Sequence, residues 1–139
     1  MVCIYCNGLT SVSNSRSSKN DVSIWRRRQC KDCNAVFTTN EVPDLDRAIV
    51  VEATDGSYEP FSFDKLYQSI LESCKHRKSP LVDARSLTKT ILRLSFSKPN
   101  NGSIPKSTVF SNCIKVLNNF DKVAATYYRA YYSDKNENN

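Results

Sequence analysis

Two Cys-x-x-Cys pairs near the N-terminus of this chain constrain its folding more than any other feature. Cys3 and Cys6 form the first pair, and Cys30 and Cys33 form the second. Two residues between thiolates allow a tight turn to direct both sulfurs at one ion, and two such turns complete a tetrahedron. We therefore predict one structural Zn²⁺ per chain, held by four thiolates in a closed site that leaves no position open for catalysis.

A redox role is the alternative for a Cys-x-x-Cys pair, which in thioredoxin-like units lies between a strand and a helix. No such βαβ pattern surrounds either pair here. A structural metal also explains how some forty residues with few large apolar groups hold a shape, because metal binding contributes folding free energy. The two remaining cysteines, Cys74 and Cys113, stand alone in apolar helical contexts that indicate core packing.

The net charge of +6 is concentrated in the cysteine-containing segment. Residues 1–40 hold six basic and two acidic side chains, whereas residues 41–139 hold 14 basic and 12 acidic ones. This excess indicates a polyanionic partner, nucleic acid first. Arg26, Arg27 and Arg28 run into the second cysteine pair, and in a strand Arg26 and Arg28 would share a face with Arg27 opposite. A solvated basic strand is the alternative to nucleic-acid contact.

The second half of the chain predicts helices that follow a short hairpin. Residues 48–51 form an apolar strand, and Asp55 with Gly56 signals a hairpin turn. Ser62 can cap a helix that begins at Phe63. Further helices are expected over residues 83–96, from near Pro105, and over residues 121–132, with residues 99–102 breaking the chain between two of them. The expected buried positions are Phe63, Leu66, Tyr67, Ile70, Leu71, Cys74, Ala84, Leu87, Ile91, Leu94, Val109, Cys113, Val116 and Leu117.

The N-terminal motifs resemble those of the NrdR family, bacterial repressors of ribonucleotide reductase genes. The resemblance rests on the two cysteine pairs and on three linked segments, residues 14–16 (Asn-Ser-Arg), 24–29 (Ile-Trp-Arg-Arg-Arg-Gln) and 37–41 (Phe-Thr-Thr-Asn-Glu). Four positions depart from the family pattern: Asn14 replaces Asp, Trp25 replaces Arg, Asn34 replaces Gly, and Val36 replaces Arg. These departures leave the metal site whole.

The second half resembles an ATP-cone, a small helical nucleotide-sensing domain with a short β-hairpin. Residues 48–51, the turn, residues 59–66 and the closing stretch from Val123 to Tyr132 carry this resemblance. The predicted fold is therefore α+β, with a zinc ribbon over residues 1–45, an ATP-cone over 46–132, and a polar tail over 133–139 that is too poor in apolar groups to pack. Glu52 stands near a position where the family carries Lys-Arg, and its carboxylate would repel a triphosphate.

The resemblance implies a repressor that binds double-stranded DNA, responds to ATP and dATP, forms a homo-oligomer, and is not an enzyme. We expect it in the bacterial cytoplasm, associated with the nucleoid, because no apolar run could span a bilayer and no signal peptide is recognisable. The expected DNA-contacting residues are Arg16, Arg26, Arg27, Arg28 and Lys31. The nucleotide-binding residues that the resemblance implies are Val51, Glu59, Lys65, Lys75 and Arg77.

Residue chemistry alone leaves other interpretations open. Lys65 is also consistent with a solvated lysine, and Lys75 and Arg77 are consistent with cations that stabilise a helix C-terminus. A zinc ribbon for general nucleic-acid or ribosome interaction, without nucleotide control, is the main alternative to the repressor. An enzyme is a third interpretation, but no catalytic triad, paired acid/base carboxylates or open metal site is evident. The operator, the oligomeric state and the preferred nucleotide do not follow from these residues.

Overall fold

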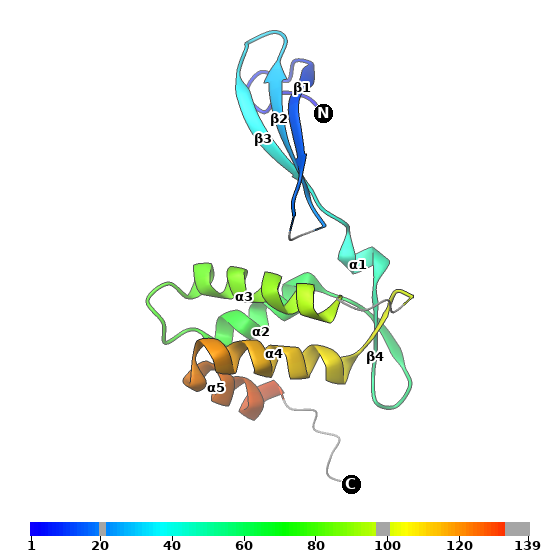
Figure 1. Ribbon diagram of the computed structural model, residues 1–139, viewed down its shortest axis with the longest axis vertical. Helices are drawn as coiled ribbons and strands as arrows, with labels where there is room; N and C mark the ends of the chain where they lie inside the picture. Colours follow the sequence, from blue (N-terminus) through cyan, green and yellow to red (C-terminus); the bar gives the residue numbers. More distant parts are fainter. Residues whose placement is uncertain (20–21, 97–100, 133–139) are drawn as a thin grey trace. The chain divides into compact units, whose positions relative to one another are not determined.

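The computed structural model describes residues 1–19, 22–96 and 101–132. The chain divides into two compact units, Met1–Asp44 and a second unit that begins at Leu45 (Figure 1). The first is a sheet with a cysteine cluster and the second is mainly helical with a small sheet, so the α+β class is confirmed. The predicted tail (residues 133–139) and part of the predicted helix break (residues 99 and 100) lie outside the described residues. None of the helices in the described ranges is long and apolar enough to cross a membrane.

The first unit is a three-stranded antiparallel sheet in the order β1-β2-β3. Its strands are β1 (Thr10–Ser17), β2 (Ile24–Cys30) and β3 (Val36–Glu41). The register places Ser15, Arg26 and Thr39 in one row across the sheet, and Asn14, Arg27 and Thr38 in the next. A β-bulge lies between Val12 and Asn14 in β1.

The two faces of this sheet differ in burial, because successive residues of a strand point to opposite sides. The face that we call the core face carries Cys30 and Phe37, which are buried together with Cys3 and with Ala35 packed against them. We call the opposite side the outer face. Its strand residues are Ser11, Asn14, Arg16, Trp25, Arg27, Gln29, Val36, Thr38 and Asn40.

The second unit begins with α1 (Leu45–Ala48) and holds a small sheet in the order β5-β4-β6. β4 (Val50–Glu52) runs antiparallel to β5 (Tyr58–Pro60) and parallel to β6 (Ser103–Pro105). The predicted hairpin turn is confirmed. Gly56 has a φ of 81°, which glycine adopts without steric cost, and the Asp55 carboxylate accepts a hydrogen bond from the Ser57 N–H at 2.9 Å.

Two details of this region correct the sequence-based expectation. Ala48 ends α1 instead of beginning the strand, because the Ile49 N–H closes a helical turn on the Leu45 carbonyl at 3.1 Å. The strand starts at Val50, whose N–H donates to the Gly102 carbonyl at 2.9 Å. β6 was not predicted, since three residues carry no periodicity and their partner strand is far away in the sequence.

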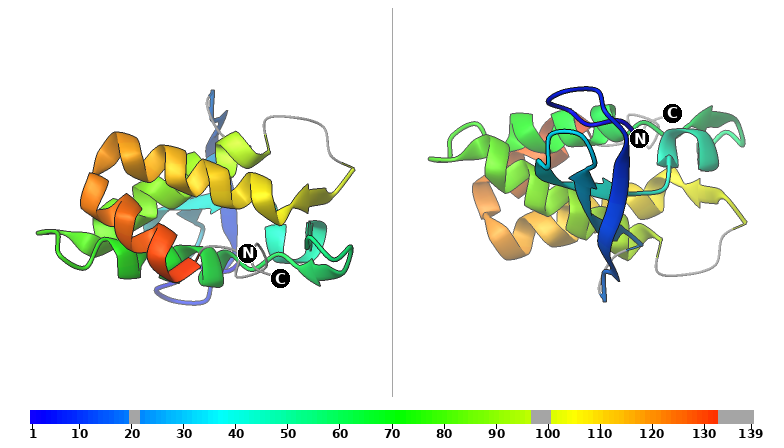
Figure 2. Two further views of the ribbon diagram at one scale, coloured as in Figure 1. Left: turned by 90° about the horizontal axis from the view of Figure 1, so that it is seen from below. Right: turned by 90° about the horizontal axis from the view of Figure 1, so that it is seen from above.

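Four helices form the body of the second unit: α2 (Phe63–Ser73), α3 (Pro80–Ser95), α4 (Lys106–Phe120) and α5 (Lys122–Tyr132). Packing of α2 on α3 and α5, and of α4 on α3 and α5, closes them into a ring (Figure 2). The predicted cap of α2 is confirmed by the Ser62 hydroxyl, which accepts from the Lys65 N–H at 3.3 Å. α3 begins at Pro80 rather than at Asp83, because proline suits the first turn of a helix.

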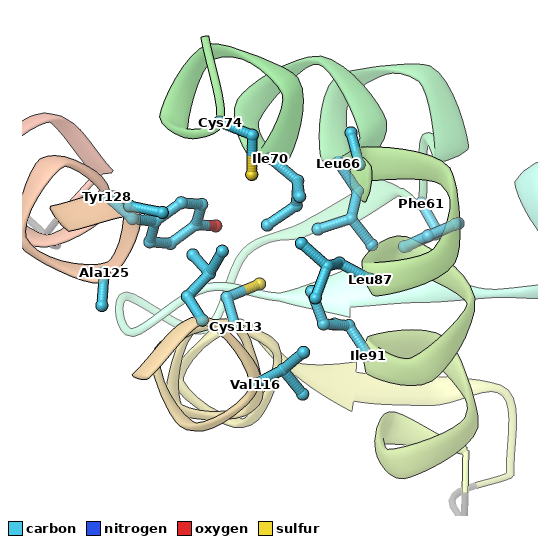
Figure 3. Close-up of a cluster of buried hydrophobic side chains, with 13 residues drawn as sticks. Phe61, Leu66, Ile70, Cys74, Leu87, Ile91, Cys113, Val116, Ala125 and Tyr128 are labelled. Carbon is cyan, nitrogen blue, oxygen red and sulfur yellow. The ribbon is translucent and has the colours of Figure 1, made fainter. Parts of the chain in front are cut away.

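The hydrophobic core lies inside this ring, where side chains from all four helices point toward one another (Figure 3). Ile70, Ile91 and Leu117 are fully inaccessible, and the Tyr128 hydroxyl is directed into the cluster (Figure 3). Cys74 and Cys113 are equally inaccessible, so their predicted core role is confirmed, and burial raises the pKa of each thiol to about 11. Five predicted core residues are only partly buried, at the edge of the cluster: Phe63, Tyr67, Leu71, Leu94 and Val109.

Candidate metal centre, basic sheet and ligand cavity

The four cysteines of the two pairs meet at one end of the first unit. Their sulfurs all lie within 4.8 Å of one another, with Cys3 Sγ 3.7 Å from Cys33 Sγ and Cys6 Sγ 3.5 Å from Cys30 Sγ. Thiolates that each lie about 2.3 Å from one tetrahedral Zn²⁺ are separated by about 3.8 Å. The donor set and its spacing therefore fit a single structural zinc ion.

The two cysteine turns have the same backbone geometry. The Cys3 N–H donates to the Gly8 carbonyl at 2.8 Å, and the Cys30 N–H donates to the Ala35 carbonyl at 2.9 Å. Asn7 and Asn34, which follow the last cysteine of each turn, have φ values of 60° and 58°. Asparagine tolerates this left-handed conformation better than most residues. Asn34 thus preserves the turn at a position where a glycine is the usual choice.

Backbone N–H groups also surround the sulfurs. The N–H groups of Cys33 and Asp32 donate to Cys30 Sγ at 3.5 and 3.4 Å, and the Tyr5 N–H donates to Cys3 Sγ at 3.4 Å. The donors at Cys33 and Asp32 lower the pKa of the Cys30 thiol to about 7. Since the thiolate is the form that binds metals, these bonds prepare Cys30 as a ligand.

The three consecutive arginines of β2 have different surroundings. On the core face, Arg26 forms an ion pair with Glu41 at 3.0 Å, and Arg28 donates to Thr39 Oγ1 at 3.3 Å and to Thr10 Oγ1 at 3.4 Å. Arg27 is exposed on the outer face, so the alternation predicted from the sequence is confirmed.

The two remaining basic candidates lie outside β2. Arg16 is exposed on the outer face, beside Trp25 of the neighbouring strand. Lys31 is exposed in the second cysteine turn. The sheet therefore separates the predicted DNA-contacting residues into a core-face pair, an outer-face pair and one lysine at the metal site.

A cavity of about 500 Å³ opens in the second unit. Three of the predicted nucleotide-binding residues, Val51, Glu59 and Lys65, line it. The other lining residues come from the same hairpin and from α2, α4 and α5: Pro60, Phe61, Ser62, Leu66, Gln68, Ser69, Lys106, Val109, Phe110, Tyr128 and Tyr132.

The cavity is basic at one side and aromatic at another. Ser62 and Lys106 mark the N-terminal ends of α2 and α4, where the helix dipole favours anions. Lys65 Nζ lies 3.8 Å from Glu59 Oε2, and both side chains are well exposed. The Tyr128 ring contacts Phe110 and Tyr132, with ring centroids 5.8 and 4.9 Å away. This arrangement suits a ligand with an anionic group and a flat apolar part.

Lys75 and Arg77 are not among the residues that line this cavity. Lys75 pairs with Glu72 of the preceding turn. Arg77 forms ion pairs with Asp83 at 3.3 Å and with Asp121 at 3.1 Å, and its guanidinium lies 4.6 Å from the centre of the Phe120 ring. These contacts connect the end of α2 to α3 and to the start of α5, which is a structural role.

Several cavity residues were not expected from the sequence, and Lys106 is the most informative of them. Lys106 had a signal, since it is a basic residue directly after the proline that starts a helix. For Tyr128 the sequence leaves core packing, a place in the nucleotide pocket and self-association all open, because helical spacing does not separate these roles. The Glu52 carboxylate was expected to repel a triphosphate, but Glu52 does not line the cavity. It lies on the face of β4 opposite to that of Val51.

Comparisons with known proteins match the first unit and also nearly the whole chain. The family model described as "Transcriptional repressor NrdR-like, N-terminal domain" matches residues 1–41. A transcriptional repressor NrdR of Sphingopyxis alaskensis is 36% identical over 140 residues, covering 99% of this chain and 88% of the relative. The NrdR proteins of Finegoldia magna and Symbiobacterium thermophilum are 33% and 31% identical, each covering 96% of this chain, with 89% and 88% of their own lengths matched. All three relatives are named as transcriptional repressors, and none of these names describes an enzyme.

Proposed function

Because this chain belongs to the NrdR family of transcriptional repressors, we propose that it represses ribonucleotide reductase genes under the control of ATP and dATP. In this proposal the first unit is a zinc ribbon that binds operator DNA at the nucleoid, and the second is an ATP-cone that binds the nucleotide. The observation that carries the nucleotide half is the cavity that joins two lysines, two helix N-termini and an aromatic wall.

The DNA half of the proposal rests on a rigid basic sheet. The cysteine cluster fits one zinc ion, and β2 leads directly into it, so the metal fixes where the arginines project. Arginine binds phosphates and guanine edges through paired hydrogen bonds. Arg16, Arg27 and Lys31 are exposed and available for such contacts.

The nucleotide half assigns parts of the cavity to parts of the ligand. Lys65 and Lys106, with the N-terminal ends of α2 and α4, face the triphosphate. Phe110, Tyr128 and Tyr132 supply flat apolar surface for the adenine ring. The Glu59 carboxylate is an acceptor for hydroxyl or amino donors of the nucleotide.

Nucleotide binding would control DNA binding through a homo-oligomer. An effector shifts an equilibrium between two assemblies only if it binds them with different affinity. Abundant dATP signals that no further reductase is needed, so dATP favours the assembly that places the zinc ribbons on the operator. ATP alone favours the other assembly.

The test is a fluorescence anisotropy titration of a labelled reductase-promoter duplex with zinc-loaded protein. Each titration is run with ATP alone and with dATP plus ATP, against a scrambled duplex at the same salt concentration, and the mass distribution of the protein is measured in parallel. Tighter, sequence-selective binding and a changed oligomer distribution with dATP are expected. Equal, salt-sensitive binding to both duplexes under every nucleotide condition would instead identify a general nucleic-acid binder.

A pair of lysine variants tests the cavity itself. Lys65→Ala should weaken dATP binding in calorimetry by about tenfold to a hundredfold, because a hydrogen bond to a charged group contributes about 1.5–3 kcal/mol. Lys89→Ala is the matched control, since Lys89 is an exposed lysine of α3 that does not line the cavity. Equal affinities for the two variants would remove the cavity from the proposal.

A further inference from the structure

The strand register sorts the polar residues of the first unit onto two sides. Asn14, Arg27 and Thr38 lie in one row on the outer face, and Arg16, Trp25 and Asn40 lie in the row beside it. Between these rows, Ser15, Arg26 and Thr39 form a row on the core face. Neighbouring residues of the same strand are therefore presented to different surroundings.

Charge and burial distinguish the two faces. The outer-face rows are exposed apart from the partly buried Trp25, and none of the outer-face strand residues is acidic. On the core face, Arg26 retains only 31% of its side-chain exposure and is paired with Glu41. Arg28 is held by two threonine hydroxyls on the same face. On the core face the arginines are thus paired with a carboxylate or with hydroxyl groups, whereas none of the described strand residues of the outer face supplies a carboxylate to Arg16 or Arg27.

Trp25 adds an apolar contact to the outer face. Together with Arg16, Ser17 and Ser18 it lines a hollow of about 310 Å³. An indole offers a flat apolar surface and one N–H donor, a combination that is enriched in binding surfaces. An apolar ring beside an arginine fits the alternation of apolar sugar or thymine methyl groups with phosphates along a DNA groove.

From these observations we infer that the outer face is the surface that contacts double-stranded DNA, with Arg16, Trp25 and Arg27 as contact residues, whereas Arg26 and Arg28 maintain the sheet. This inference rests on the proposed DNA-binding function and narrows it to one face. Five basic residues were expected at the DNA interface from the sequence. The inference excludes Arg26 and Arg28 from that interface and adds Trp25 to it.

A pair of matched substitutions tests the assignment in the full-length, zinc-loaded protein. Thr38→Asp places a carboxylate opposite Arg27 on the outer face, and Ser15→Asp places one opposite Arg26 on the core face. Both positions are exposed strand residues and both changes alter the net charge equally, so long-range electrostatics is matched. Thr38→Asp should weaken DNA binding by about tenfold or more, and Ser15→Asp by less than about threefold, since losing an arginine contact costs about 1–3 kcal/mol.

The probes are the promoter duplex and a mixed-sequence duplex at low salt, with zinc content and thermal unfolding measured to show that both variants fold. Equal loss of affinity in the two variants overturns the face assignment and leaves the proposed function standing. If the wild-type protein binds neither duplex, the face assignment and the proposed DNA-binding function are both overturned.

The wild-type protein supplies an independent readout, because Trp25 is the single tryptophan of the chain. Saturating DNA should quench its fluorescence and reduce its accessibility to iodide. An unchanged emission spectrum and iodide quenching, at DNA concentrations where anisotropy shows full binding, would exclude Trp25 from the interface. Misfolding of a variant cannot affect this measurement.

Discussion

The two units of this protein are held together by different means. In the first, the buried apolar cluster consists of Cys3, Cys30 and Phe37, with Ala35 packed against it. In the second, 13 buried side chains from four helices and the adjoining loop form one cluster (Figure 3). The cluster in the first unit is too small to offset the conformational entropy that is lost when the strands become ordered, and a metal is therefore needed there. The second unit buries enough apolar surface to fold without a metal.

This difference means that the units can be perturbed separately. The zinc ribbon should be sensitive to chelators, which do not act on an apolar helical core. The helical unit is sensitive to truncation of its core, which leaves the four thiolates in place.

The largest expected effect is the removal of zinc. A strong chelator should unfold residues 1–44 and abolish DNA binding, because structural zinc contributes about 10–16 kcal/mol to the folding of small zinc domains. The helical circular dichroism signal should persist. Limited proteolysis with mass spectrometry checks this, and protease resistance of residues 1–44 after complete zinc loss would contradict it.

The reverse experiment truncates the helical core. Ile91 lies in α3 and is fully inaccessible to solvent. The substitution Ile91→Ala should destabilise the second unit by about 2–5 kcal/mol, because it removes buried apolar atoms and leaves a cavity. Zinc content should not change. Urea unfolding followed by circular dichroism measures the loss, and Leu81→Ala, at a position 62% exposed in the same helix, is the control with little effect.

A smaller loss is expected at the start of α2. Ser62→Ala removes the acceptor for the Lys65 N–H and should cost the second unit about 1 kcal/mol. Ser62→Asn, which can still accept that hydrogen bond, should recover most of the stability in the same unfolding experiment. If alanine and asparagine behaved alike, the cap would not be the source of the effect.

The smallest effect on the stability of the second unit is expected when the pH is lowered. The pKa of Asp121 is lowered to about 2 by the His76 ring and by the backbone N–H of Ala124, with further contributions from the Val123 N–H and Arg77. A depressed carboxyl pKa means that the stabilisation is present above about pH 4 and is lost as the pH falls toward 2.

Asp121→Asn retains a capping oxygen but removes this charge. Its thermal stability, followed by the helical signal, should therefore fall less steeply than that of the wild type between pH 4 and 2. Zinc release from the protonated thiols of the first unit occurs in acid as well, but it contributes little to the helical signal. Parallel stability profiles for the two proteins would show that the charge has no such role.

The features that the sequence predicted correctly are those that depend on residues close together in the chain. The cysteine spacing predicted the metal site, Ser62 predicted the start of α2, and helical periodicity predicted the buried faces that contain Ile70 and Ile91. Each of these depends on residues within a turn or two of one another, where covalent geometry and local hydrogen bonds decide the outcome. The misplaced strand start at Ala48 and the missed β6 depended on partners elsewhere in the chain.

The sequence by itself thus determined that this chain has a four-thiolate zinc site, a basic strand leading into it and an amphipathic helical unit. Only the tertiary structure decided which arginines are engaged within the sheet, that Arg77 joins three helices, and that Lys106 and Tyr128 meet Lys65 at one cavity. The reason is that side-chain periodicity fixes the face of an element, whereas strand register and helix packing fix what that face meets. In this protein, register and packing select the residues available to DNA and to the proposed nucleotide.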